Sequence, residues 1–217
     1  MRARELLEDV RRELGPLNSS IVECAYLRDA REGRLDLDAI KLFVENQFYI
    51  VHHDARSLAA MASRASDDLE LEYFMRLAQG DAEALRRLRE MGRDLGMELR
   101  SIGEVRAIPE AVGYTHFLSH LALHANPGEQ AFALVVNLPV WSEACRRLLG
   151  ALGERYGLKS LGFLELFAEV PAWVEEEGLV VCERYVDLSG QRMRLFAALV
   201  QRYERAFWEG LSGPVEG

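Results

Sequence analysis

The chain has 217 residues, 49% of them hydrophobic, and a formal net charge of -9. This length and composition suit one domain with a continuous core. The acidic charge argues against a nucleic-acid partner, because phosphates are neutralised by clustered Lys and Arg. No apolar stretch approaches the ~18 residues that cross a bilayer, so we expect no membrane partner either. A small-molecule ligand is the expected partner.

The cysteines and the amino terminus indicate the cellular compartment in which the protein is expected. Cys24, Cys145 and Cys182 are far apart and odd in number, which is typical of free thiols in a reducing compartment. The first residues, 1–5, read MRARE and predict the start of a charged helix, not a secretory signal. We therefore expect a cytoplasmic protein with a single domain over residues 1–217.

Apolar residues recur every three or four positions along the chain, and no alternating strand pattern is present, so we expect an all-α protein. Gly15-Pro16 should stop the first helix, and Gly80-Asp81 and Ser189-Gly190 should interrupt two later ones. The expected helices span about residues 3–14, 19–31, 38–64, 67–92, 109–125, 127–156, 160–177 and 180–210.

The sixth expected helix contains the almost wholly apolar segment Ala131–Trp141, in which Asn137 and Pro139 are lodged. Proline removes a backbone donor and clashes with the carbonyl one turn earlier, which costs about 3 kcal/mol and usually kinks the helix. We expect the kink to open a carbonyl beside Asn137 and Trp141. This segment is therefore predicted to form one wall of a ligand pocket.

Glu204 is the most unusual polar residue of the last expected helix, because it shares a face with apolar residues such as Val200, Phe207 and Leu211. Burial would raise the pKa of this carboxyl and suit it to proton transfer near neutral pH. The alternative is an ion pair with an arginine at the domain edge.

Polar residues also interrupt the core face of the third expected helix. Gln47 and Asp54 lie on its apolar stripe, and Tyr49 and His53 lie on an adjoining face. They either supply hydrogen-bonding groups to a cavity or form a satisfied network between helices. Tyr114 likewise falls on an apolar face, so its hydroxyl needs an internal partner.

Metal and thiol chemistry have weaker support. His116, His120 and His124 are spaced four apart, but a di-iron bundle needs Glu-x-x-His pairs on facing helices, and the chain has none. We expect no metal and no cofactor. Cys145 follows Trp141 by about one turn, although a cysteine on a helix is more often a small buried hydrophobe.

Five short segments, in their order along the chain, carry a resemblance to a known family: residues 43–51, 78–80, 113–115, 138–141 and 203–208. Together they resemble the TenA family, which includes thiaminase II and relatives such as PqqC. The resemblance implies an all-α, heme-oxygenase-like multi-helix bundle with a central ligand pocket, and a homo-oligomer. Classical members hydrolyse an aminopyrimidine derived from thiamin, using an aspartate and aromatics to hold the ring, a cysteine nucleophile and a glutamate proton shuttle.

The family's site residues are only partly retained in this chain. Glu204 matches the catalytic glutamate and Tyr114 a pocket tyrosine. Gln47 stands where the aspartate is expected, Ile50 replaces a tyrosine, and Val140 occupies the nucleophile's position. A valine cannot attack carbon, so the resemblance implies a divergent member without the catalytic cysteine.

The leading hypothesis is hydrolysis of a thiamin-related aminopyrimidine, or another small heterocycle, in which Glu204 activates water while Tyr114 and Gln47 orient the ligand. Three further residues of the matched segments are expected to bind the substrate, Tyr49, Trp141 and Tyr203, and Val140 is expected to contact it without reacting. The alternatives are a non-catalytic binding protein that keeps the pocket and a metal-dependent oxidase of the same fold.

Overall fold

The computed structural model describes residues 2–212 and is helical throughout this range, with no strand. The all-α prediction is confirmed. No helix in the described part is both long and apolar enough to span a bilayer. The elements are α1 (Ala3–Val22), α2 (Ala25–Glu32), α3 (Leu37–Ser63), α4 (Asp68–Asp94), η1 (Ile102–Glu104), α5 (Pro109–His124), α6 (Pro127–Tyr156), α7 (Gly162–Phe167), α8 (Ala172–Glu183) and α9 (Val186–Ser212).

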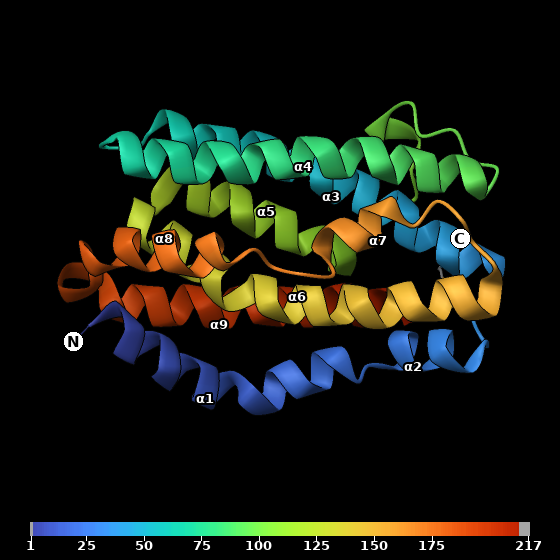
Figure 1. Cartoon of the computed structure of the whole chain (residues 1–217), viewed down its shortest axis with the longest axis horizontal. Coiled ribbons are helices and arrows are strands. Elements are labelled where there is room, and N and C mark those ends of the chain that lie inside the picture. Colours follow the sequence, from blue (N-terminus) through green and yellow to red (C-terminus); the bar gives the residue numbers. More distant parts are fainter. Residues whose placement is uncertain (1, 213–217) are drawn as a thin grey trace.

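The helices are arranged in layers along the long axis of the molecule (Figure 1). The long helices α6 and α9 pack against each other, and α1 and α2 cover one side of this pair. On the other side α3 packs against α4 and α5, and α5 in turn packs against α9. The short helices α7 and α8 contact both α6 and α4. The space between the α6–α9 pair and α3–α5 is therefore enclosed on several sides.

Side-chain caps set several of the helix starts that the sequence predicts. The Asp36 carboxylate accepts a hydrogen bond from the Ala39 amide at 2.8 Å, and Asp67 accepts one from Glu70 at 3.0 Å. Asn126 begins α6 with a capping box. The predicted break near Ser189-Gly190 is confirmed, because Ser189 has φ -136° and ψ 18° inside α9.

Two helix breaks predicted from the sequence, at Gly15-Pro16 and at Gly80-Asp81, are absent from the structure. The first helix does not stop at Gly15-Pro16, since α1 runs on to Val22. Pro16 is exposed, so water can replace the lost hydrogen bond, while Ile21 on the same helix is fully buried. Helix α4 likewise continues through Gly80, because a glycine inside a helix costs only about 1 kcal/mol and the flanking turns pack on α3.

The predicted helix over 160–177 is two helices, α7 and α8, joined by residues 168–171. The predicted start of the last helix near residue 180 is also wrong, because α8 continues to Glu183 and α9 begins at Val186. Pro171 lacks an amide hydrogen and disfavours helical backbone at Val170, so the chain extends there, with Pro171 at φ -60° and ψ 139°. This linker passes over α6 and contributes to the cavity described below.

Pro139 does not end α6, which stays one helix from Pro127 to Tyr156. The carbonyl one turn earlier, that of Val135, loses its helical donor and instead accepts a hydrogen bond from the Arg11 guanidinium of α1 at 3.5 Å. The carbonyl expected to open beside the pocket is therefore satisfied by α1. The helix still forms a pocket wall, but through its side chains.

Candidate functional site

A cavity of about 190 Å³ lies between α3, α4 and α5 on one side and α6, the 168–171 linker and α9 on the other. Most of its wall is apolar, and besides Tyr114 it is lined by four aromatic residues: Trp141, Phe167, Trp173 and Phe207. The polar groups that line it are few: Gln47, Asp54, Asp81, Tyr114, Asn137 and Glu204, with Arg76 and Glu169 also contributing. An apolar cavity with a few polar groups is typical of a small-molecule site.

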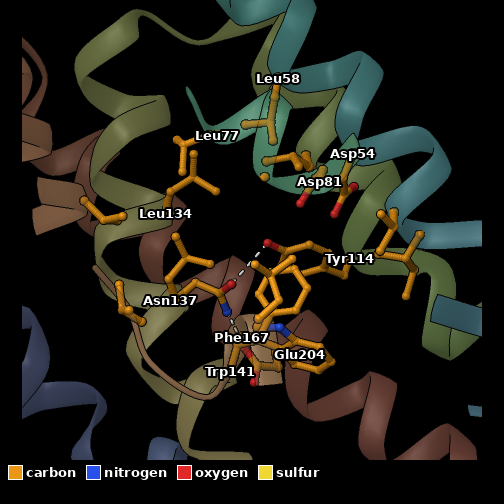
Figure 2. Close-up of a pocket in the computed structure, with 18 of the residues that line it drawn as sticks. Asp54, Leu58, Leu77, Asp81, Tyr114, Leu134, Asn137, Trp141, Phe167 and Glu204 are labelled. Carbon is orange, nitrogen blue, oxygen red and sulfur yellow. Dashed lines mark hydrogen bonds between the residues drawn. The ribbon is translucent and has the colours of Figure 1, made fainter. Parts of the chain in front are cut away.

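One end of the cavity is organised around Asn137 of α6 (Figure 2). Its side-chain amide donates hydrogen bonds to Glu204 of α9 and to Gln201 at 2.8 Å, and its oxygen accepts one from the Tyr114 hydroxyl at 3.1 Å. The Gln201 amide in turn donates to Asn18 of α1 at 2.6 Å. These bonds fix the orientation of the Asn137 amide and hold Glu204 in place.

The Glu204 carboxyl is only 3% exposed. Burial raises its pKa to about 8, and the hydrogen bond from Asn137 opposes that rise. The nearby Trp208 indole N–H also lowers the pKa of Glu204, although its geometry falls short of a hydrogen bond. Within residues 2–212 the Glu204 Oε1 atom has no hydrogen-bond partner. Glu204 can therefore exchange a proton near neutral pH through an unoccupied oxygen.

The other end of the cavity carries two carboxyls, Asp54 of α3 and Asp81 of α4, which lie next to each other in Figure 2. Asp54 accepts a hydrogen bond from the Thr115 hydroxyl. Burial raises the pKa of Asp54 to about 7. Burial also raises the pKa of Asp81 well above its usual range, and the adjacent Asp54 adds to that rise.

Tyr114 lies between the two ends. Burial raises the pKa of its hydroxyl well above the usual range, and Asp54, Glu204 and Asp81 each raise it further. The tyrosine therefore stays neutral, and its hydroxyl donates a hydrogen bond to the side-chain oxygen of Asn137. Its need for an internal partner, expected from the sequence, is met within the cavity wall.

The structure brings four of the predicted site residues together: Gln47, Tyr114, Trp141 and Glu204 all line the cavity. The other three lie outside the lining. The Tyr49 hydroxyl contacts His116 Nε2 at 3.1 Å on an exposed face. Tyr203 stacks on the Phe117 ring with centroids 5.2 Å apart, and Val140 packs against the core.

The cavity offers no cysteine, serine or threonine nucleophile, because none of the residues that line it is of these types. Cys145 is fully buried, and burial raises its pKa well above the usual range. It is not part of the lining. The structure thus gives Cys145 the packing role that a helical cysteine usually has.

Three residues of the cavity wall were not predicted as site residues: Asn137, Asp54 and Asp81. The first two had a visible signal, since each interrupts an apolar run. Asp81 had one as well, because it falls four residues after Leu77 and seven before Leu88, on the apolar face of α4. The preceding Gly80 obscured that signal by suggesting a break.

The three spaced histidines of α5, His116, His120 and His124, lie on the exposed face of the helix. No cluster of three or more His, Cys, Asp or Glu with the geometry to hold a metal ion occurs among the described residues. The polar groups of the cavity are better suited to bind an organic ligand.

Comparisons with known proteins identify the family and the shared fold. A family model described as the TENA/THI-4/PQQC family matches residues 12–212. A TenA homologue from Pyrococcus horikoshii OT3 superposes with TM-score 0.78 at 18% identity, over 95% of this chain and 97% of its own. Among curated proteins, none matches this chain.

Two further solved structures share the fold. A TenA homologue from Pseudomonas syringae has TM-score 0.79 at 14% identity, over 94% of this chain and 91% of its own. A candidate TenA-like thiaminase from Sulfolobus solfataricus P2 has TM-score 0.72 at 15% identity, over 94% of each chain. At these identities the structural likeness establishes the shared fold alone.

Proposed function

Because the chain belongs to the TENA/THI-4/PQQC family, we propose that its cavity binds a thiamin-related aminopyrimidine, or a similar single-ring heterocycle, and hydrolyses it without a cysteine nucleophile. The observation that carries the proposal is Glu204, a residue of the cavity wall whose buried carboxyl has a pKa of about 8 and one oxygen without a hydrogen-bond partner among the described residues.

The size and walls of the cavity favour a single aromatic ring. A cavity of roughly 150 Å³ holds benzene, so about 190 Å³ leaves room for a ring with small substituents. Trp141, Phe167 and Phe207 provide flat apolar surfaces against which such a ring packs. Gln47 and Tyr114 supply hydrogen-bonding groups that orient it.

The proposed reaction replaces an exocyclic amino group by a hydroxyl group. The ionised Glu204 takes a proton from a water molecule, whose oxygen attacks the exocyclic carbon of the ring substituent. The carbon–nitrogen bond breaks, its electron pair leaves with nitrogen, and Glu204 returns the proton to the departing amine. With an aminomethyl substrate the products are an alcohol and ammonia. With a formylamino substrate the activated water attacks the formyl carbon instead, the nitrogen leaves with the electron pair and the proton, and the products are an amine and formate. No covalent enzyme intermediate forms in either case.

Asn137 is a positioning residue in this scheme. Its bond to Glu204 Oε2 holds one carboxyl oxygen and leaves Oε1 for water, while Tyr114 and Gln201 hold the Asn137 amide itself. Donors fixed before the substrate arrives need no reorganisation during the reaction, which is how a buried site gains from polar groups.

The decisive experiment is hydrolysis of aminomethylpyrimidine and formylaminopyrimidine substrates by Glu204→Gln. We expect kcat to fall at least about 100-fold, with little change in ligand affinity, because the amide keeps the shape but cannot carry the proton. The wild-type rate should rise with pH towards about 8, following ionisation of Glu204. Glu209→Gln, an exposed carboxyl on the same helix, is the matched control. Unchanged hydrolysis by Glu204→Gln would refute the proposal.

The second candidate function is ligand binding without catalysis. It is favoured by the position of Val140, which has no thiol and lies outside the cavity lining. In that case calorimetry detects binding across a panel of aminopyrimidines while none of them is hydrolysed.

A further inference from the structure

The cavity contains a pair of carboxyls for which the proposed hydrolysis has no use. Asp54 of α3 and Asp81 of α4 lie together at the end away from Glu204, and both line the cavity (Figure 2). Asp54 is 7% exposed, while the exposed part of Asp81 faces the cavity. Two adjacent carboxyls in an apolar wall are costly unless a proton or a cation offsets their charge.

The surrounding helices supply no such cation from the described residues. Arg76 of α4 lines the cavity, but its guanidinium pairs with Glu177 at 2.6 Å and stacks on the Trp173 ring at 3.7 Å. The remaining ionisable groups of the wall are acidic or neutral: Tyr114 from α5, Glu204 from α9 and Glu169 from the linker. The pair therefore faces a cavity that carries no positive charge directed at it.

We propose that Asp54 and Asp81 form the subsite for a cationic amino group on a single-ring ligand. The proposal deepens the proposed function and rests on it in taking the cavity as the ligand site. A protonated aminomethyl group or a protonated aminoheterocycle carries the donors and the charge that two carboxyls accept. Gln47 cannot replace them, since a neutral amide carries no negative charge to offset that of the cation.

The unpartnered Oε1 of Glu204 at the opposite end is independent support that a ligand occupies this space. Tyr114 and Asn137 lie between the carboxyl pair and Glu204 (Figure 2), so a ring whose amino group is at the pair would lie beside these two residues and present its other side towards Glu204. The cavity then binds a polar group at each end and an apolar ring in the middle.

This subsite couples ligand binding to proton release. In the empty protein burial raises the pKa of Asp54 to about 7, and burial together with repulsion from Asp54 raises that of Asp81 well above its usual range, so the pair retains a proton at pH 6. A bound cation stabilises the ionised form and displaces that proton to the solvent. Affinity for a cation should therefore rise as the pH increases from 5.5 to 7.5, by linkage between the two equilibria.

The test compares benzylamine with benzyl alcohol, which have similar shapes but differ in charge, by titration calorimetry at pH 6 in two buffers of different ionisation enthalpy. We expect benzylamine to bind about tenfold more tightly and to release about one proton, and benzyl alcohol to release none. Equal affinity of the two probes, or no binding of benzylamine, overturns the proposal.

Isosteric variants test whether benzylamine binding and proton release depend on Asp54 and Asp81. Asp81→Asn and Asp54→Asn should each lower benzylamine affinity about tenfold and abolish most of the proton release. Asp54→Asn retains an oxygen that accepts the Thr115 hydrogen bond, so it keeps the local structure. Glu165→Gln, an exposed carboxyl of α7 outside the cavity, is the matched control and should behave like wild type.

The results also separate this proposal from hydrolysis. Proton-coupled binding of benzylamine without hydrolysis of any aminopyrimidine removes the catalytic function and keeps the amine subsite. Hydrolysis that depends on Glu204 but has an unchanged KM and pH profile in Asp81→Asn removes the subsite and keeps the catalytic function.

Discussion

The two ends of the cavity hold the same chemical group in different surroundings. Glu204 is bound by Asn137, whose own amide is held by Tyr114 and Gln201, and this chain of amides reaches Asn18 on α1. At the other end, Asp54 has the Thr115 hydroxyl and then faces the second carboxyl, Asp81. Burial raises the pKa at both ends.

This difference shows that hydrogen-bond donors, more than burial, decide what a buried carboxyl can do. Donors on one oxygen fix the Glu204 side chain and leave the other oxygen free for proton transfer. Two carboxyls that face each other need a proton or a cation between them. We therefore assign proton transfer to the first end and recognition of positive charge to the second.

The largest expected effect is on stability as a function of pH. Unfolded carboxyls have pKa values near 4, whereas burial raises Glu204 to about 8 and Asp54 to about 7 in the folded protein. Between these values the folded state binds protons that the unfolded state has lost. Stability should therefore fall as the pH rises from 5 to 8.5, by on the order of 7 kcal/mol for the two carboxyls together.

Urea denaturation across this pH range measures how stability falls with pH. Two variants show how much of the fall comes from each end of the cavity. Glu204→Gln should remove the part of the decline that extends up to about pH 8, and Asp54→Asn the part that ends near pH 7. A wild-type stability that is flat or rises over this interval contradicts the burial of uncompensated carboxyls.

The second effect comes from breaking the amide chain. Asn137→Leu removes the partner of Glu204 Oε2, of the Gln201 side-chain oxygen and of the Tyr114 hydroxyl in a buried site, while the Gln201 amide keeps its bond to Asn18. We expect a loss of about 3 kcal/mol in the free energy of unfolding, together with a pH–rate profile moved upward, because the bond that lowers the Glu204 pKa is gone. Urea denaturation measures the loss of stability, and kcat measured as a function of pH shows whether the profile has moved. A stability loss with an unmoved profile would mean that Asn137 has only a structural role.

A smaller effect is expected at the other end from Thr115→Val, which keeps the shape and removes the donor to Asp54. The free energy of unfolding should fall by about 1 kcal/mol at pH 8.5 and by less at pH 5.5, where Asp54 is protonated. Ser57→Ala removes a hydroxyl one turn along α3 and should show no such dependence on pH. Equal losses at both pH values would contradict the assignment.

The smallest effect is expected from Gly80→Ala, beside the carboxyl pair. A Cβ there meets nothing within 4 Å, so alanine should stabilise α4 by up to about 1 kcal/mol through its helix propensity. Gly150→Ala on α6 is equally unobstructed and should stabilise similarly. Since Gly80 lines the cavity, its substitution alone should also weaken binding of benzylamine. Equal affinities in the two variants would argue against a ligand at this end.

Much of the fold follows from local signals. Capping residues such as Asp36 and Asn126, and prolines in first turns such as Pro109, set helix starts within a few residues of the predicted positions. The prolines inside helices were harder to interpret. Pro16 and Pro139 stay within helices because neighbouring helices or water satisfy the freed carbonyls, whereas Pro171 separates α7 from α8.

The site was only partly predictable, for a related reason. Periodicity marked Glu204, Gln47 and Tyr114 as polar residues on apolar faces, and all three line the cavity. It did not distinguish Trp141, which lines the cavity, from Val140 and Tyr203, which lie outside it. A position on a helix face predicts burial, but the packing of the neighbouring helices decides whether the buried side chain meets a cavity or a core.

The sequence by itself therefore determined that the chain folds into helices, where most of them begin, and which carboxyl is buried on the last one, since caps and the 3.6-residue period act within a few turns. Only the tertiary structure placed Asp54 beside Asp81 and joined Glu204 to α1 through Asn137, Gln201 and Asn18. Those groups are far apart in the chain, and their electrostatic coupling exists only once the helices pack around a common cavity.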